Sequence, residues 1–181
     1  MSRRVPQPAV ERIVDPAARP LVVGVVPGQP ALVTLTAARW AAATRGALHL
    51  AFVDTARYVV DEQPDGSVRH ASLDPDGADD DWRTTEAELR AWAEGVLAPT
   101  HVPWSLHYLA GRPDRALTHL ARAVDAAAIV VGTRAPGTAA RMRELLEGSV
   151  AVHLAHHQHR PVLTVPLDVV DWSQTRSPWG R

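Results

Sequence analysis

Short apolar runs alternate with segments of helical pattern through most of this chain, and this alternation constrains the fold more than any other feature. The runs lie at residues 21–26, 48–53, 128–131 and 162–165, and residues 104–109, whose pattern alternates, predict one more strand. Runs of this kind are typical of parallel strands that are buried on both faces. Because a helix-length segment separates each run from the next, the sequence predicts an α/β fold: a parallel sheet with helices on both faces.

The segments between these runs carry helix start and stop signals. Residues 31–45 are rich in alanine and leucine, and Gly46 stands where a C-cap glycine is expected. A second helix is expected from residue 81 or 84 to residue 97. Pro113 suits the first position of a third helix, because the N–H that proline lacks would have no partner there.

The composition excludes several classes of site. The 181 residues include no cysteine and no lysine, which excludes disulfides, thiolate metal ligands, Schiff-base chemistry and a P-loop lysine. A net charge of −1 gives no general attraction to nucleic acid. No apolar run reaches the ~20 residues of a membrane span, and the N-terminal residues do not resemble a signal peptide. The sequence therefore predicts a cytoplasmic protein that binds neither nucleic acid nor membranes.

The chain length fits one domain with additions at both ends. We expect a flexible arm at residues 1–20, the α/β domain at residues 21–166 and a tail at residues 167–181. The tail contains Trp172 and Trp179, whose indole rings would cover a surface of the domain or of a partner subunit.

Residues 54–82 form an acidic insert that a minimal strand–helix–strand unit does not need. A Pro-Asp-Gly turn at residues 64–66, between β-type residues, predicts a hairpin. Residues 61–81 hold eight acidic residues and one arginine. The insert is interpreted as a cation site, a lid or a solvated loop, and its aspartates lack the order of an EF-hand.

The stretch from residue 127 to residue 150 has the pattern of a strand, a glycine-containing loop and a helix start. Gly132 ends the strand, Gly137 lies in the loop, and Gly148 and Ser149 open the helical pattern. Glycines let the backbone approach a ligand, and the free N–H groups of a helix start attract an anion. The spacing indicates a phosphate-binding loop, although an ordinary strand-to-helix loop also uses glycine.

Several segments together resemble the universal stress protein family. They are Val130-Val-Gly-Thr-Arg134, Gly148-Ser-Val150 and His157-Gln-His-Arg-Pro-Val-Leu-Thr-Val165. Residues 21–53 are similar to the first strand, helix and second strand of the same family, and the resemblance covers nearly all of residues 21–166. It implies a Rossmann-like, open, twisted five-stranded parallel sheet of order 3-2-1-4-5 and a stress-response or regulatory role. It also implies an adenine nucleotide at the switch point between the first and fourth strands.

Carried over residue by residue, the resemblance implies a set of nucleotide-binding residues: Val26, Val53, Gly132, Thr133, Arg134, Gly137, Gly148, Ser149 and Val150. The ligand would be ATP, with no metal beyond a phosphate-bound Mg²⁺. The resemblance further implies a homodimer through the last strand, Val162–Val165, and an unidentified signalling protein as a partner. It implies ligand binding without catalysis, and the sequence has no catalytic motif of the common hydrolase and transferase classes.

Two departures from the family pattern keep alternatives open. The aspartate that follows the first strand in the family is Val26 here, and the second loop glycine is Ala135. The alternative function is a dimeric interaction module of the same fold whose nucleotide pocket no longer binds. A third hypothesis is a weak ATP hydrolase that uses Glu144 or Glu147 as its base.

Four histidines cluster near the end of the domain: His153, His156, His157 and His159. His153 and His157 are four positions apart and would share one helix face, as pairs of metal ligands do. No third ligand lies nearby in the sequence, so a packing role or an interaction with the helix C-terminus is favoured over a metal site.

Overall fold

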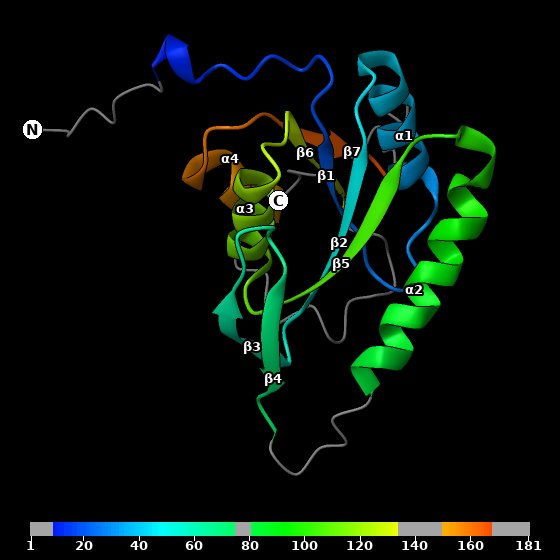
Figure 1. Ribbon diagram of the computed structural model, residues 1–181, viewed down its shortest axis with the longest axis vertical. Helices are drawn as coiled ribbons and strands as arrows, with labels where there is room; N and C mark the ends of the chain where they lie inside the picture. Colours follow the sequence, from blue (N-terminus) through cyan, green and yellow to red (C-terminus); the bar gives the residue numbers. More distant parts are fainter. Residues whose placement is uncertain (1–8, 75–80, 134–149, 168–181) are drawn as a thin grey trace, which may run out of the picture.

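The computed structural model describes residues 9–74, 81–133 and 150–167, and Figure 1 shows its central sheet with helices around it. The strands of this sheet are β1 (Leu21–Gly24), β2 (Leu48–Asp54), β5 (Trp104–Ala110), β6 (Ala128–Gly132) and β7 (Val162–Val165). They lie in the order β5-β2-β1-β6-β7, and every neighbouring pair is parallel. Numbered along the chain, these five strands have the order 3-2-1-4-5, which confirms the expected Rossmann-like fold.

Strand β1 lies at the centre of the sheet. Val23 is paired with Leu50 of β2 on one side and with Val130 of β6 on the other. The strand ends at Gly24, earlier than the apolar run at residues 21–26 predicted. It ends there because the chain turns: the Gln29 N–H donates to the Val26 carbonyl oxygen at 3.2 Å.

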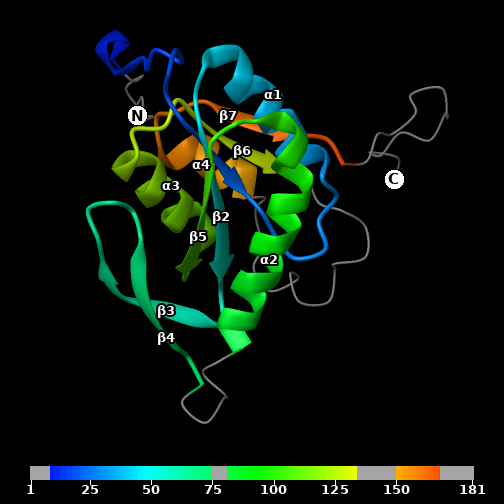
Figure 2. The same ribbon diagram turned by 45° about the vertical axis from the view of Figure 1, so that its right-hand side comes forward.

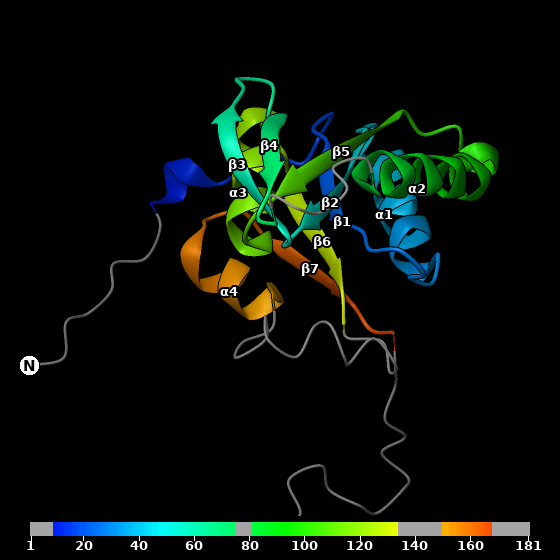
Figure 3. The same cartoon turned by 90° about the horizontal axis from the view of Figure 1, so that it is seen from below.

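The helices cover both faces of the sheet, as expected. They are α1 (Leu32–Thr44), α2 (Asp81–Leu97), α3 (Pro113–Ala123) and α4 (Val150–His157), with short 3₁₀ turns η1 (Val10–Arg12) and η2 (Ala98–Thr100). Figure 3 shows α1 and α2 on one face and α3 and α4 on the other, and we call these the α1–α2 face and the α3–α4 face. None of the helices that the structure describes is long and apolar enough to cross a membrane.

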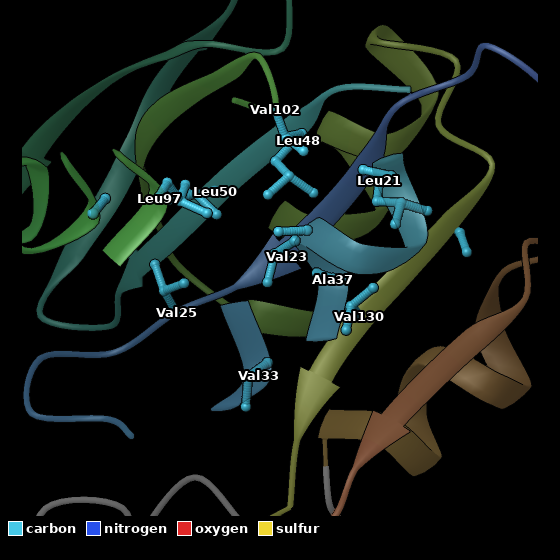
Figure 4. Packing of buried hydrophobic residues seen from close by; sticks show 14 of the residues in the cluster. Leu21, Val23, Val25, Val33, Ala37, Leu48, Leu50, Leu97, Val102 and Val130 are labelled. Atoms are coloured by element: carbon cyan, nitrogen blue, oxygen red, sulfur yellow. The ribbon is translucent and has the colours of Figure 1, made fainter. Parts of the chain in front are cut away.

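The α1–α2 face holds an apolar core, shown in Figure 4. Leu48 and Leu50 of β2 and Val23 of β1 are fully buried there against Val33 and Ala37 of α1. Burying one such leucine contributes about 1.5–3 kcal/mol. Because side chains alternate along a strand, the intervening residues of β1 and β2 point to the opposite face.

The α3–α4 face holds a second apolar core. Val22 of β1, Ile129 of β6, Leu120 of α3 and Leu154 of α4 are completely buried in it. Val68, from the segment that follows β2, packs against the edge of this core. The two cores together hold the helices to the sheet.

The predicted hairpin is confirmed. Strands β3 (Arg57–Glu62) and β4 (Val68–Ser72) form an antiparallel pair outside the main sheet, and Figure 2 shows it beside β5 and α3. Gly66 in its turn has φ +85°, a conformation that glycine adopts without strain. A Cβ at Gly66 would lie 2.6 Å from Cδ1 of Leu120, so the turn of the hairpin is closely packed on α3.

The end of α1 differs from the expectation that Gly46 is its C-cap residue. Arg45 is the left-handed residue there, with φ 57°, and the Gly46 N–H donates to the Ala41 carbonyl oxygen at 2.8 Å. Gly46 is required for another reason, because a Cβ at this position would lie 2.2 Å from the Arg19 carbonyl oxygen. The glycine therefore permits the close approach of a distant part of the chain.

The last residues of the expected N-terminal arm contact the domain. The Ala18 N–H donates to the Thr44 carbonyl oxygen at 2.8 Å. The Arg19 guanidinium pairs with the Asp125 carboxylate, which also accepts from the buried Arg160 at 3.2 Å. These contacts join the chain before β1 to the end of α1 and to the turn between α3 and β6.

Candidate functional site

The sheet has a switch point between β1 and β6. The chain passes from β1 outward to β2 and β5, whereas β6 and β7 lie on the other side of β1. In open α/β sheets, ligands bind outside the carboxyl ends of the strands at such a point. The pairing of Val23 with Val130 brings these ends, Gly24 of β1 and Gly132 of β6, side by side.

Two of the expected site residues, Val26 and Val53, lie at the carboxyl ends of β1 and β2. Both are half-buried, and Val53 packs against the core of the α3–α4 face. Val26 presents an apolar side chain where the family resemblance implies a carboxylate. This side of the site is therefore suited to an apolar or aromatic group.

Gly132 and Thr133 lie together at the end of β6, where the resemblance implies a phosphate contact. A Cβ at Gly132 would lie 2.9 Å from Cγ2 of Val33 and 3.1 Å from Cδ1 of Leu167, so close packing requires the glycine. The Thr133 N–H donates to the Val165 carbonyl oxygen at 2.8 Å, and Oγ1 of Thr133 accepts from the Leu167 N–H at 2.7 Å. Both polar groups of Thr133 thus join the ends of β6 and β7.

Helices α1 and α4 both begin without an acidic residue in the first turn, so no carboxylate there offsets their positive ends. Val150 is the first residue of α4, and it packs half-buried against the core of the α3–α4 face. The other residues expected to bind the nucleotide, Arg134, Gly137, Gly148 and Ser149, lie outside the described residues.

Two polar side chains near the start of α1 lack hydrogen-bond partners. Nε2 of Gln29, in the turn after β1, and Oγ1 of Thr34, in the first turn of α1, are buried and have no partner among the described residues. An unpaired buried polar group costs about 1–3 kcal/mol. A ligand that offers an acceptor to these groups would remove that cost, and sequence patterns gave no indication of them.

A polar and aromatic cluster at the carboxyl ends of β2 and β5 was missed by the sequence reasoning. The Tyr108 hydroxyl donates to Oδ2 of Asp54 at 2.7 Å, and burial, followed by this bond, raises the pKa of Tyr108 well above its usual value. Arg57 is 6% exposed and donates from Nε to Nδ1 of His70 at 2.7 Å. The Trp82 ring meets His70 edge-on and lies tilted against Tyr108, with ring centroids 4.9 and 5.6 Å apart. The only available signal was the position of Asp54 directly after the second apolar run.

An open cavity of about 360 Å³ lies beside this cluster, between the hairpin and the start of α2. Its lining residues are Gln63, Ser67, Val68, Arg69, His70 and Trp82. None of them was expected to bind the nucleotide, so this cavity is distinct from the switch point.

Among the residues that the structure describes, the histidines of α4 are not grouped with acidic side chains that could share a metal ion. The rings of His153 and His157 have centroids 5.8 Å apart in a T-shaped arrangement, and Nδ1 of His153 lies 3.7 Å from the Asp114 carboxylate. Within the described ranges, no three His, Cys, Asp or Glu side chains are placed to hold one ion. His156 and His157 lie in the last turn of α4, where the helix dipole favours a positively charged side chain.

Comparison with solved structures supports the same fold. The universal stress protein from Archaeoglobus fulgidus is similar at 22% identity and a TM-score of 0.57, covering 82% of this chain and 94% of that chain. A structure of the universal stress protein from Archaeoglobus fulgidus in complex with dAMP is similar at 21% identity and a TM-score of 0.55, covering 81% of this chain and 97% of that chain. A universal stress protein in complex with cAMP is similar at 23% identity and a TM-score of 0.53, covering 84% of this chain and 99% of that chain.

Comparison with curated proteins finds no match. A model of the universal stress protein family matches residues 18–166, which include all five parallel strands and the four α-helices of the structure. The extent of that match and the strand order lead to one conclusion: this chain belongs to the universal stress protein family.

Proposed function

We propose that this protein binds an adenine nucleotide, with ATP as the expected ligand, at the carboxyl ends of β1 and β6. The observation that carries the proposal is the family's sheet, whose switch point lies between these two strands. Similar proteins have been solved in complex with dAMP and with cAMP, which are adenine nucleotides. Nε2 of Gln29, which has no partner among the described residues, adds a donor near this edge that a polar ligand would satisfy.

The residues divide into two groups by chemistry. The apolar side chains of Val26 and Val53 suit the adenine ring, which is flat and largely apolar on its faces. The phosphates are assigned to the segment from the end of β6 to the start of α4, because guanidinium groups and helix-start N–H groups bind phosphate well. Its residues are Gly132, Thr133, Arg134, Gly137, Gly148, Ser149 and Val150. A Mg²⁺ ion would accompany the phosphates and offset their charge.

The proposed role is regulation by binding, without turnover, in a cytoplasmic response to stress. Ligand binding would favour one arrangement of the loop that includes Arg134 and Arg143. We propose that the active form is a homodimer through β7. This strand pairs with β6 on one side only within the described sheet, and an edge strand needs a partner or a cover.

The test is calorimetry of the full chain with ATP, ADP and AMP, repeated with Ser149→Ala. We expect a Kd on the order of micromolar for ATP. Removing the hydroxyl at the helix start should weaken binding by about tenfold, the loss of one charge-assisted hydrogen bond. Ser72→Ala, on β4 and away from the switch point, is the matched control and should leave the affinity unchanged.

A second candidate function is a dimeric interaction module whose pocket does not bind. The observation in its favour is that the N–H and the hydroxyl of Thr133 are both already bonded to the end of β7. Absence of heat with all three nucleotides from folded protein would refute the nucleotide proposal and support this second function. Its partner would then be sought by crosslinking of the full chain.

A further inference from the structure

Two histidines and a serine converge on the α3–α4 face at the β2–β5 edge of the sheet. His49 lies on β2, and Ser105 and His107 lie on β5. The register pairs His49 with Ser105 and Ala51 with His107, so the three side chains project from one face. Nδ1 of His49 lies 2.9 Å from Nε2 of His107, and Oγ of Ser105 lies 3.0 Å from each nitrogen.

This cluster is separate from the nucleotide switch point. His49 is paired with Val22 near the start of β1, whereas the switch point lies at the ends of β1 and β6. The hairpin turn lies on the same face as the cluster, because Gly66 packs on Leu120 of α3. The three side chains are half-buried, so solvent and small ions can reach them.

The protons available do not serve all three short contacts. A neutral imidazole carries one N–H, and a ring nitrogen that carries hydrogen cannot also accept a hydrogen bond. At most one of the two facing nitrogens of His49 and His107 can therefore carry a hydrogen while they stay 2.9 Å apart. The Ser105 hydroxyl supplies one more hydrogen. Two hydrogens are thus available for the three contacts among these atoms. A cation at the centre would instead engage all three lone pairs at once.

A carboxylate of the hairpin turn acts on the same cluster. The Ser67 N–H and hydroxyl donate to Oδ1 of Asp65 at 2.9 and 2.7 Å, which fixes this carboxylate in the turn. Its negative charge acts on His107. A negative charge near the cluster favours a bound cation.

We propose that Nδ1 of His49, Nε2 of His107 and Oγ of Ser105 form a binding site for a divalent transition metal, with Zn²⁺ as the ion that fits best. Zinc takes nitrogen and oxygen ligands, and a tetrahedral ion with bonds of ~2.0–2.1 Å holds its ligand atoms ~3.3 Å apart. The observed triangle would need to widen by only a few tenths of an ångström, which side-chain rotation can supply. Water would take the fourth position.

The ligand set makes this an exchangeable site. Only two of its three protein ligands are histidines, and the third is a neutral hydroxyl, which binds zinc more weakly than a carboxylate or thiolate does. Its ligands come from two paired strands, a rigid support for a small site. A bound ion would join β2 to β5 beneath the hairpin and stabilise that edge of the sheet.

The test is a Zn²⁺ titration of the full chain by calorimetry, followed by thermal unfolding with and without the metal. The wild type should bind one equivalent and unfold at a higher temperature with Zn²⁺ present. His49→Gln and His107→Gln should each lower the affinity for Zn²⁺ at least tenfold. Neither variant should show the rise in unfolding temperature that Zn²⁺ produces in the wild type. Ser105→Ala should weaken binding less than either histidine change.

The control addresses the histidine pair of α4. His153→Gln combined with His157→Gln removes the α4 pair and should leave Zn²⁺ binding unchanged. Visible absorption of bound Co²⁺ reports a four-coordinate environment directly, and it should persist in the α4 double variant and disappear in His49→Gln.

Three results would overturn the proposal: no Zn²⁺ binding by folded wild type, binding that survives His49→Gln, or binding lost only in the α4 double variant. If His107→Gln fails to fold, His49→Gln and Ser105→Ala decide the outcome with the Co²⁺ spectrum as the readout.

Discussion

The two faces of the sheet are built from the same strands but differ in what they bury. On the α1–α2 face, Leu48 and Leu50 of β2 enter a dry apolar core. On the α3–α4 face, the residue between them, His49, meets Ser105 and His107 in a polar cluster. Adjacent positions of one strand therefore have opposite chemical roles.

The difference follows from what covers the β2–β5 edge on each side. Helix α2 packs against this edge on the α1–α2 face, where Trp104 and Leu106 of β5 join the core. On the other face, α3 covers the centre of the sheet, and the β3–β4 hairpin covers the edge only in part. Polar side chains can remain half-buried under a hairpin that leaves access to water, whereas Leu48 and Leu50, which lie under the helices, are fully buried and apolar.

The largest expected effect is a difference in stability between variants at two adjacent residues of β2, which point to opposite faces of the sheet. Leu50→Ala should lower the free energy of unfolding by about 2–5 kcal/mol, because it leaves a cavity in a fully buried site. His49→Ala should cost clearly less, since that side chain is half-buried. Urea denaturation of the two variants measures the difference, and equal losses would show that the faces do not differ as described.

A smaller effect is expected where α1 meets the end of β6. Gly132→Ala should cost about 1–3 kcal/mol, because its Cβ would lie 2.9 Å from the stiff side chain of Val33. Gly95→Ala is the control, since nothing lies within 4 Å of a Cβ there, and it should stabilise α2 by about 0.5–1 kcal/mol. Adding Val33→Ala should reduce the Gly132→Ala penalty in a double-mutant cycle. A penalty that stays the same would mean that Val33 is not its cause.

The smallest effect is a pH dependence of the stability that arises from His107 on the α3–α4 face. The pKa of His107 in the folded protein, about 4, lies below the unfolded value of 6.5, so the unfolded chain binds more protons between these values. Stability from this group is therefore present above pH 6.5 and is lost as pH falls toward 4. The urea midpoint of His107→Gln should fall less than that of the wild type over this range.

The control for the pH experiment is His101→Asn, an exposed position after η2 and outside the α-helices. Its midpoint should follow the wild type at each pH. If His107→Gln also follows the wild type, the polar cluster does not contribute to the pH dependence.

The site at the switch point was only partly accessible to sequence reasoning. The glycine pattern led us to assign Gly132 to phosphate binding, but the structure shows that Val33 and Leu167 require a glycine there as well. One residue type can satisfy a ligand and a packing contact alike, and spacing does not distinguish them. Nε2 of Gln29, buried without a partner among the described residues, had no sequence signal, because burial of a polar atom depends on its neighbours in space.

The amino-acid sequence by itself determined the elements and their order. Apolar runs of strand length, helix signals such as Pro113 and the turn at Gly66 act over a few neighbouring residues, so they can be read locally. Strand order followed from a family resemblance that spans most of the chain, and it was confirmed.

Only the tertiary structure decided which distant residues meet. His49 and His107 are 58 positions apart, and each alone would be taken for an ordinary strand residue. Gly46 is likewise needed because of the Arg19 backbone and not because of its own helix. The physical reason is that contacts, burial and pKa shifts depend on distances in space, which a sequence pattern reports only within one strand, turn or helix.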